Sequence, residues 1–364
     1  MSGPITCILV GDPILALLSA AGIRAAEAIY AGYAEAERLR GEHGVASDRR
    51  NDSLRAADRT GRAAIEHEAA AAEARFEQLI AVADQLGASA QVRATRPVRP
   101  EGTDYATVAA YARGLHQLAD ELQAILVMAA DRLAAAAGED EARFEPGTAA
   151  LALEGTTPEA IARRLLERIA HLGPPPTHIA ALAKELEATP PGERANLLAM
   201  ELRRSVQLHL DAAQRALVQQ ATGTIVRQTL KDLGYEVEDV ADTLFVDGGV
   251  LHFRRAGWGD YMVRLRADPK AGSVNFNVVR GVDAEAANNE ATVLDHLAED
   301  RWCAEFPALL NALAARGVRL DVTRRLAAGE LPVQRVEREL LPRFAADADE
   351  PRTIASPKSR KLPS

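Results

Sequence analysis

The residues with the clearest chemical potential are the cationic side chains between positions 250 and 281. This stretch holds six basic residues and two acidic ones, although the whole chain has a net charge of −9. The six are Arg254, Arg255, Arg264, Arg266, Lys270 and Arg280. Guanidinium groups recognise carboxylates and phosphates through charge-assisted hydrogen bonds. The cluster therefore indicates a recognition surface for a protein partner or a nucleic-acid backbone.

Period-two alternation in this stretch predicts which of these side chains share a sheet face. Arg264 and Arg266 alternate with apolar residues, and Asn275 and Asn277 do so on the next predicted strand. Neighbouring strands place such residues side by side. The predicted partner-binding residues are His252, Arg254, Trp258, Arg264, Arg266, Asn275 and Asn277. The alternative is a solvated sheet face with cross-strand hydrogen bonds and no partner.

Catalytic motifs are not found in the sequence. No two of the eight histidines have the i, i+3 or i+4 spacing of a helical zinc site, and GxSxG, GxGxxG and GxxxxGK[ST] do not occur. Cys303 has no histidine near it in sequence, and a lone cysteine is more often a small buried hydrophobe. We therefore predict no catalytic, cofactor-binding or metal-ligating residue and no cofactor. An enzyme site assembled from dispersed residues stays open.

One stretch is similar in element order to the restriction-nuclease core. A helix, the residues Gly-Tyr-Glu-Val from position 234, three strands and another helix follow one another. That chemistry needs carboxylates that hold Mg²⁺ beside a cation. Here the corresponding strand reads Val263-Arg264-Leu265-Arg266, with arginines where the metal-binding carboxylate belongs. The resemblance implies at most a degenerate, non-catalytic relative.

Composition limits the class of protein. Hydrophobic residues make up 48% of the 364 positions but aromatic residues only 4%, so alanine, leucine and valine dominate and helices are favoured. The acidic net charge argues against a protein that binds nucleic acid over its whole surface. Cys7 and Cys303, far apart, support neither disulfides nor a thiolate zinc site, and they fit a reducing cytoplasm.

Three long segments repeat small and apolar residues at steps of three and four, as helices with a continuous stripe do. They are 15–39, 65–86 and 108–133. The third stripe is wider, so its helix should pack against more than one neighbour. We expect the first two helices to form an antiparallel hairpin. Pairing within one chain and pairing between chains have the same periodicity, so both stay open.

We interpret two breaks, at 88–104 and 138–155, as loops, and shorter helices should follow the second. Thr156, Pro158 and Glu159 have the chemistry of a helix start, and Gly173 precedes a triple proline that ends this helix. Thr177 is expected to cap the next short helix. A long helix then runs past Leu217, with a kink expected at 222–224.

After Gly234 the sequence predicts an antiparallel meander. Alternating residues mark strands near 251–253, 261–265 and 274–278, and turn residues separate them. Helical patterns over 284–316 should cover one face, and 318–322 should return as a strand. The apolar stretch 5–23 is interrupted by Asp12 and Pro13, so we expect buried helix and strand there rather than a membrane span. The tail after Phe344 is expected to be disordered.

We therefore expect a mainly α protein with an N-terminal helical bundle or coiled coil and a small C-terminal α+β module. The predicted division is 1–140 bundle, 150–222 helical connector, 223–326 α+β module, and 327–364 short helix and tail. The expected function is a non-enzymatic, cytoplasmic scaffold or adaptor that binds protein partners or itself. The alternative is a nucleic-acid-binding accessory protein that uses the arginine-rich sheet face. No membrane span is expected.

Overall fold

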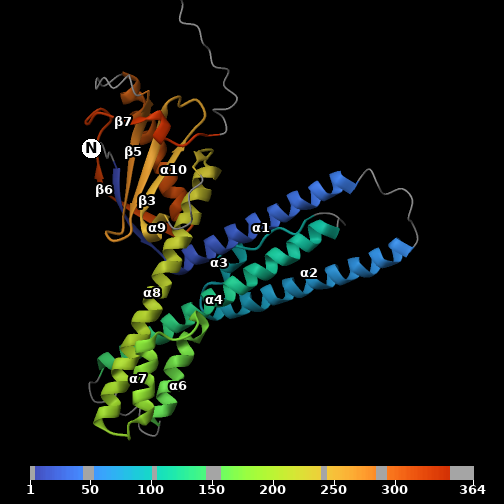
Figure 1. The fold of residues 1–364 in the computed structure, drawn as a ribbon, viewed down its shortest axis with the longest axis vertical. Helices are drawn as coiled ribbons and strands as arrows, with labels where there is room; N and C mark the ends of the chain where they lie inside the picture. The colour runs from blue at the N-terminus through green and yellow to red at the C-terminus, as the bar shows by residue number, and fades with distance from the viewer. Residues whose placement is uncertain are drawn as a thin grey trace, which may run out of the picture. The chain divides into compact units, whose positions relative to one another are not determined.

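A computed structural model gives the fold of the chain (Figure 1). It describes residues 5–43, 53–100, 105–144, 157–238, 244–283 and 293–344. The chain is mainly helical with an antiparallel sheet near its C-terminal end, as the sequence predicts. The tail after Phe344, which we expected to be disordered, lies outside the described residues.

The helices of the described residues carry the labels of Figure 1. They are α1 (Pro13–His43), α2 (Ser53–Gln85), α3 (Ser89–Ala94), α4 (Tyr105–Phe144), α6 (Pro158–Ile169), α7 (Thr177–Ala188), α8 (Glu193–Asp232), α9 (Leu244–Asp247) and α10 (Val293–Ala314), with the 3₁₀ turns Ala170–Leu172 and Arg338–Leu340. The strands are β1 (Ile5–Gly11), β2 (Glu236–Val237), β3 (Gly249–Arg254), β4 (Tyr261–Asp268), β5 (Ser273–Val282), β6 (Val318–Arg325) and β7 (Gln334–Glu337).

The chain divides into two compact units. The sheet unit comprises 1–10, 226–315 and 319–364, and the helical unit comprises 11–225 with 316–318. The boundary near residue 225 falls inside α8, which is one continuous helix through the expected kink at 222–224. The four-part division predicted from the sequence is finer than these two units and stays a prediction.

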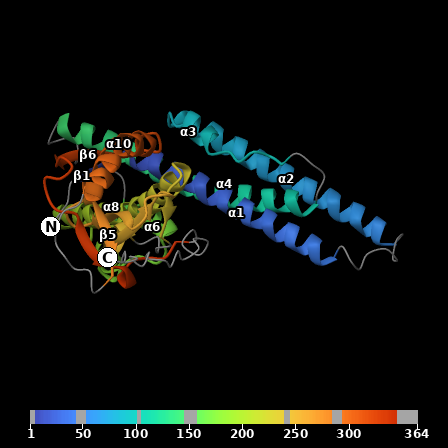
Figure 2. The same ribbon diagram turned by 90° about the horizontal axis from the view of Figure 1, so that it is seen from above.

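α4 is the central helix of the first three long helices. It packs along both α1 and α2, and Figures 1 and 2 show the three side by side. The predicted stripes are the contact surfaces, and their buried members include Leu18, Ala25 and Ile29 of α1, Ala69, Ala72, Phe76 and Ala83 of α2, and Val108, Leu115, Leu118, Leu122 and Ile125 of α4. The stripes therefore pair within one chain.

The expected hairpin of the first two helices is wrong in one respect, because α1 and α2 pack mainly on α4 rather than on each other. The wide stripe of α4 accounts for this, since it offers apolar side chains to two neighbours at once. The segment 88–104 is also not entirely loop. It contains α3, and Arg96 after α3 pairs with Glu77 of α2 at 2.6 Å.

The second helical group consists of α6, α7 and the first half of α8. These helices share one core, formed by Ala162, Leu165, Ile169, Ile179, Ala183, Leu186, Ala195, Ala199, Leu202 and Val206. The cap of α6 is Thr157 rather than Thr156, and its hydroxyl accepts from the backbone N–H of Ala160. Pro176 precedes α7, so Thr177 is its first residue and not its cap.

The sheet has the strand order β2-β3-β4-β5-β1-β6, and β7 pairs with β5 in parallel. The meander β3-β4-β5 and the strand β6 lie where the sequence predicts strands. β1 is the main difference, because residues 1–140 were expected to form one helical bundle. Instead β1 runs antiparallel to β5, with Ile5 opposite Phe276. The second difference is β7, which lies in a segment expected to hold only a helix and a tail.

α10 covers one face of the sheet, as predicted. Its Trp302 and Phe306 are almost fully buried and contact Phe276 of β5, with ring centroids 5.8 and 5.3 Å from that of Phe276. Phe253 of β3 lies 5.5 Å from Trp302 in an edge-to-face arrangement. Such pairs add about 0.5–1.5 kcal/mol each beyond the area they bury. This aromatic cluster is the main core of the sheet unit.

Part of the other sheet face is covered as well. Met262 and Val279 are buried there beneath Leu341 and Phe344, which follow β7. Apolar side chains of the C-terminal segment and polar side chains therefore share this face of the sheet.

α1 is long and apolar enough, between Pro13 and Glu35, to cross a membrane by length and composition alone. Core helices can meet the same criterion. Here the helix packs along α4, and the guanidinium of Arg24 pairs with the carboxylate of Glu121 at 2.6 Å. Packing on α4 therefore accounts for its apolar stripe.

Candidate binding site on the sheet

The strand register places six of the predicted residues on one face. His252 of β3 lies opposite Arg264 of β4, which lies opposite Asn277 of β5. Arg266 lies opposite Asn275. Because alternate residues of a strand share a face, Arg254 belongs to the same row as His252. We call these six residues the polar sheet face: His252, Arg254, Arg264, Arg266, Asn275 and Asn277.

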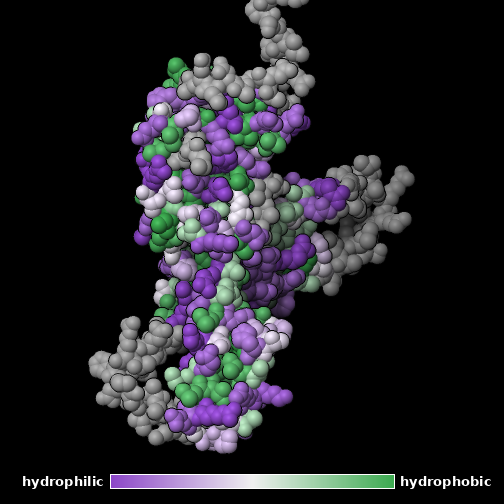
Figure 3. All heavy atoms as spheres, turned by 60° about the vertical axis from the view of Figure 1, so that its left-hand side comes forward, coloured by the Kyte–Doolittle hydropathy of each residue, from purple (hydrophilic) through white to green (hydrophobic). Residues whose placement is uncertain are grey.

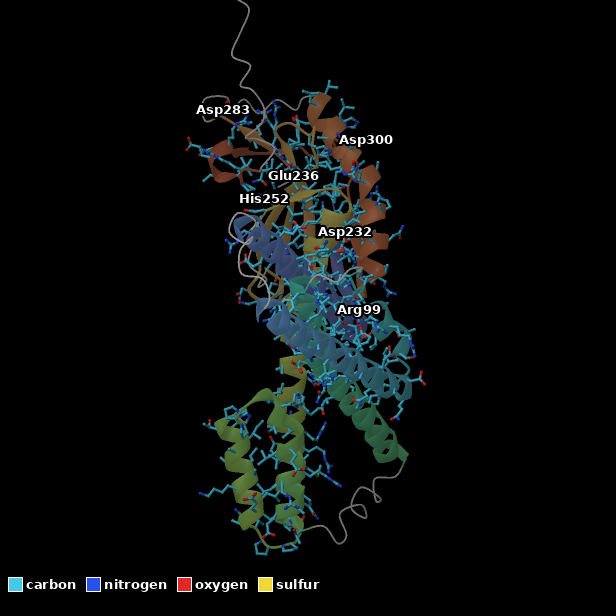
Figure 4. The ribbon with its side chains drawn as sticks, turned by 90° about the vertical axis from the view of Figure 1, so that its right-hand side faces the viewer. Arg99, Asp232, Glu236, His252, Asp283 and Asp300 are labelled. Atoms are coloured by element: carbon cyan, nitrogen blue, oxygen red, sulfur yellow. The ribbon has the colours of Figure 1, made fainter. Side chains whose placement is uncertain are left out.

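Two members of the polar sheet face are paired with carboxylates. The Nε–H of Arg254 donates to Glu236 at 3.0 Å, and the Nδ1 of His252 lies 2.9 Å from Oε2 of Glu238. Figure 4 shows Glu236 and His252 close together in the sheet unit. The guanidinium of Arg254 also stacks 4.8 Å from the ring centroid of Phe344. Both side chains are therefore already paired with carboxylates.

Arg264 is held by neutral groups. Its Nε–H donates to Oδ1 of Asn277 at 3.4 Å, and its Nη2 donates to Oε1 of Gln334 in β7. Burial lowers the pKa of the Arg264 guanidinium, and the charge of Arg266 lowers it further. The cation is thus positioned by amide oxygens but not neutralised by them.

Arg266 is exposed in the same row, two residues before Asp268, the last residue of β4. Across the residues that the structure describes, neither Arg264 nor Arg266 lies within ion-pair distance of a carboxylate. Two residues apart on a strand, the side chains stand about 7 Å from each other. This pair is therefore a local surplus of positive charge on an acidic protein.

The asparagines of the row have unmet hydrogen-bonding atoms. Asn277 is only 4% exposed, and its Nδ2 donor has no hydrogen-bond partner among the described residues. Oδ1 of Asn275 is buried and likewise has no partner in this part of the chain. Buried polar atoms are paired in the great majority of cases, so unpaired ones beside two cations are a reason to expect a ligand.

Trp258 does not join this face. It lies in the turn between β3 and β4, is 6% exposed, and packs edge-to-face against Tyr235 at 6.4 Å. The guanidinium of Arg301 in α10 lies 5.5 Å from its ring centroid. Trp258 is therefore a member of the aromatic cluster on the α10 side of the sheet.

Sequence reasoning missed four residues that shape the site. Glu236 and Glu238 flank a valine at period-two spacing, a signal that could have placed them on a strand beside β3. Gln334 and Phe344 carried no such signal, because β7 joins β5 from a distant, irregular part of the chain.

Within the described ranges, no group of three histidine, cysteine, aspartate or glutamate side chains is arranged to hold a metal ion. The strand with Arg264 and Arg266 also places two arginines where a nuclease-like core would need carboxylates. The geometry of the polar sheet face is suited to binding an anion. Comparison with protein-family models, curated proteins and solved structures finds no match to this chain.

Proposed function

We propose that this protein is a non-enzymatic adaptor that binds a partner protein through the polar sheet face. The observation that carries the proposal is the pair Arg264 and Arg266, two cations without a carboxylate partner among the described residues. A desolvated cation without a counter-charge is unfavourable, and a partner's acidic group would remove this penalty. Binding, rather than bond breaking, is the chemistry these side chains support.

The helical unit serves in this proposal as the scaffold. The stripes of α1, α2 and α4 are filled within the chain, so self-association would use other surfaces. α8 offers exposed apolar residues for assembly, Leu197, Met200 and Leu208. Figure 3 shows hydrophobic residues scattered among hydrophilic ones on one side of the molecule. The two distant thiols fit the reducing cytoplasm as its location.

Affinity purification from the native cells, with charge-reversal variants, tests the proposal. Arg264→Glu/Arg266→Glu should lose the partner that the wild-type chain retains, and Arg266→Glu alone should weaken it. The matched control is Arg319→Glu/Arg324→Glu, which changes two exposed arginines of β6 and the net charge equally. A partner retained by all variants, or no partner at all, would contradict the proposal.

The same arginine pair favours nucleic-acid binding as a second candidate function. Phosphate contacts make such binding fall steeply as the salt concentration rises. Titration of the full chain with labelled single- and double-stranded oligonucleotides at several salt concentrations separates the two candidates. Binding that weakens with salt and disappears in Arg264→Glu/Arg266→Glu would favour this second function. Absence of oligonucleotide binding would rule this second function out.

A further inference from the structure

We infer that Arg264, Arg266 and Asn277 form a carboxylate-binding site for an acidic, partly apolar segment of a partner protein. This inference rests on the proposed function and names the chemistry of its ligand. The site lies on the sheet face that Leu341 and Phe344 partly cover.

Charge is the first argument. The pKa of Arg264 is lowered because the guanidinium is partly buried and stands near Arg266. Both effects disfavour its charged form, and both would be offset by a negative charge placed between the two side chains. Within the described ranges, the carboxylates of Glu236 and Glu238 on this face are engaged by Arg254 and His252, and Asp268 accepts from the backbone N–H groups of Lys270 and Ala271. A negatively charged ligand would supply the counter-charge that the arginine pair lacks among the described residues.

Preorganisation is the second argument. The hydrogen bonds from Arg264 to Asn277 and Gln334 use two of the five N–H groups of a guanidinium and fix its plane. The remaining N–H groups stay available for the forked contact that arginine makes with a carboxylate. A side chain already ordered before binding loses little entropy when the ligand arrives.

The unpaired amide donor is the third argument. Asn277 is nine-tenths buried, it contacts Arg264 directly, and its Nδ2 has no acceptor. An ionised carboxylate is an acceptor with two oxygens, so it can receive hydrogen bonds from a guanidinium and an amide together. A cation as ligand would be repelled, and a neutral donor would leave both groups unpaired.

The surroundings favour a protein segment over a nucleic-acid backbone. Exposed Asp268 ends the row that contains Arg266, and Glu236 and Glu238 border the other side of the face. A long polyanion would meet these carboxylates, whereas one acidic side chain would not. Val250 is 38% exposed directly opposite Arg266, and Ile8 of β1 is 44% exposed on the same face. These apolar side chains suit a segment with apolar residues beside its acidic group.

Fluorescence anisotropy with a labelled hexapeptide that carries one glutamate between apolar residues tests the inference on the full chain. The wild type should bind the peptide, and Arg266→Glu should weaken binding about tenfold or more through loss of a charge-assisted hydrogen bond. Arg319→Glu/Arg324→Glu should leave the affinity unchanged. Because Arg266 is exposed, its replacement should not disturb folding, which circular dichroism checks. Asn277→Asp, which adds a negative charge inside the site, should also abolish binding.

Two results would overturn the inference. One is peptide binding that is absent or equal in wild type and Arg266→Glu, and the other is tighter binding of an oligothymidylate of the same length. If the peptide fails while affinity purification still recovers a partner that depends on Arg264 and Arg266, the adaptor function stands and only the carboxylate assignment falls. If purification also fails, the proposed function falls with it.

Discussion

Gly114 of α4 lies so close to Ile29 of α1 that a Cβ atom on the glycine would stand 2.3 Å from Cγ1 of the isoleucine. Real Cβ atoms do not approach other atoms this closely. Gly32 of α1 is similar, because its Cβ would stand 2.6 Å from that of Ala110. The contact between α1 and α4 therefore depends on glycines at its centre.

Gly114→Ala should destabilise the protein by about 1–3 kcal/mol, because Ile29 is buried and β-branched and cannot easily move aside. Gly61→Ala in α2 is the matched control, since its Cβ would meet Tyr105 at an ordinary 3.5 Å. Gly61→Ala should stabilise the protein by about 0.5–1 kcal/mol, because alanine favours a helix more than glycine does. Urea unfolding of both variants measures the two effects, and a gain in stability for Gly114→Ala would contradict the packing.

Trp302→Ala should cost about 3–5 kcal/mol, because this side chain is fully buried among the aromatic residues of the sheet unit. Leu297→Ala on the same helix should change the free energy of unfolding by no more than about 0.5 kcal/mol, because Leu297 is 55% exposed. Denaturant midpoints of the two variants test this. Equal effects would mean that α10 faces the sheet differently.

Glu299→Gln should stabilise the protein at neutral pH. Glu299 in α10 is buried, which raises its pKa above the ordinary 4.5, although the N–H of Gly329 and the charge of His296 lower it and Asp295 raises it. A raised folded-state pKa means that stability falls as the pH rises from the unfolded to the folded value. Glutamine does not ionise, so the variant avoids this loss of stability, and its side-chain oxygen still accepts from the N–H of Gly329.

Melting temperatures of wild type and Glu299→Gln between about pH 4 and about pH 8 measure this effect. The difference should be largest at the alkaline end and should vanish below the ordinary glutamate value, where both states are protonated. A difference that grows toward acid would show that Glu299 is stabilising as an anion.

Cys7 should resist alkylation in the native protein. It is fully buried in β1, and burial together with the charge of Asp321 raises the pKa of its thiol to about 11, so little reactive thiolate forms. Cys303 is less buried and should react first with iodoacetamide. Mass spectrometry of the modified peptides gives the order, and rapid modification of Cys7 in folded protein would contradict the pairing of β1 with β5.

The helices and the meander could be predicted because each has its own periodicity. The stripe of α4 that includes buried Leu122 and Ile125 follows helical spacing, and Val263 and Leu265 follow the spacing of a strand. β1 could not be placed in the sheet, because its five apolar residues resemble a buried helix as much as a strand, and its partner β5 is more than 260 positions away. Pairing over such a distance leaves no local pattern.

The polar row itself could be predicted, since alternation alone puts Arg264 and Asn277 on one face. The charge balance of the row could not. It depends on Glu238 reaching His252 and on Gln334 arriving from β7, and both contacts are tertiary. Trp258 was predicted to bind the partner, but its large ring is buried in the aromatic cluster instead.

Photo-crosslinking in the native cells tests the central claim most directly, because it reports what touches the polar sheet face. A benzoylphenylalanine placed at position 250, where the exposed Val250 lies opposite Arg266, should crosslink to one partner protein, and the crosslinked peptide should contain acidic residues. The same group at position 319 of β6 should not yield this product. Equal products at both positions, or none at position 250, would contradict the account.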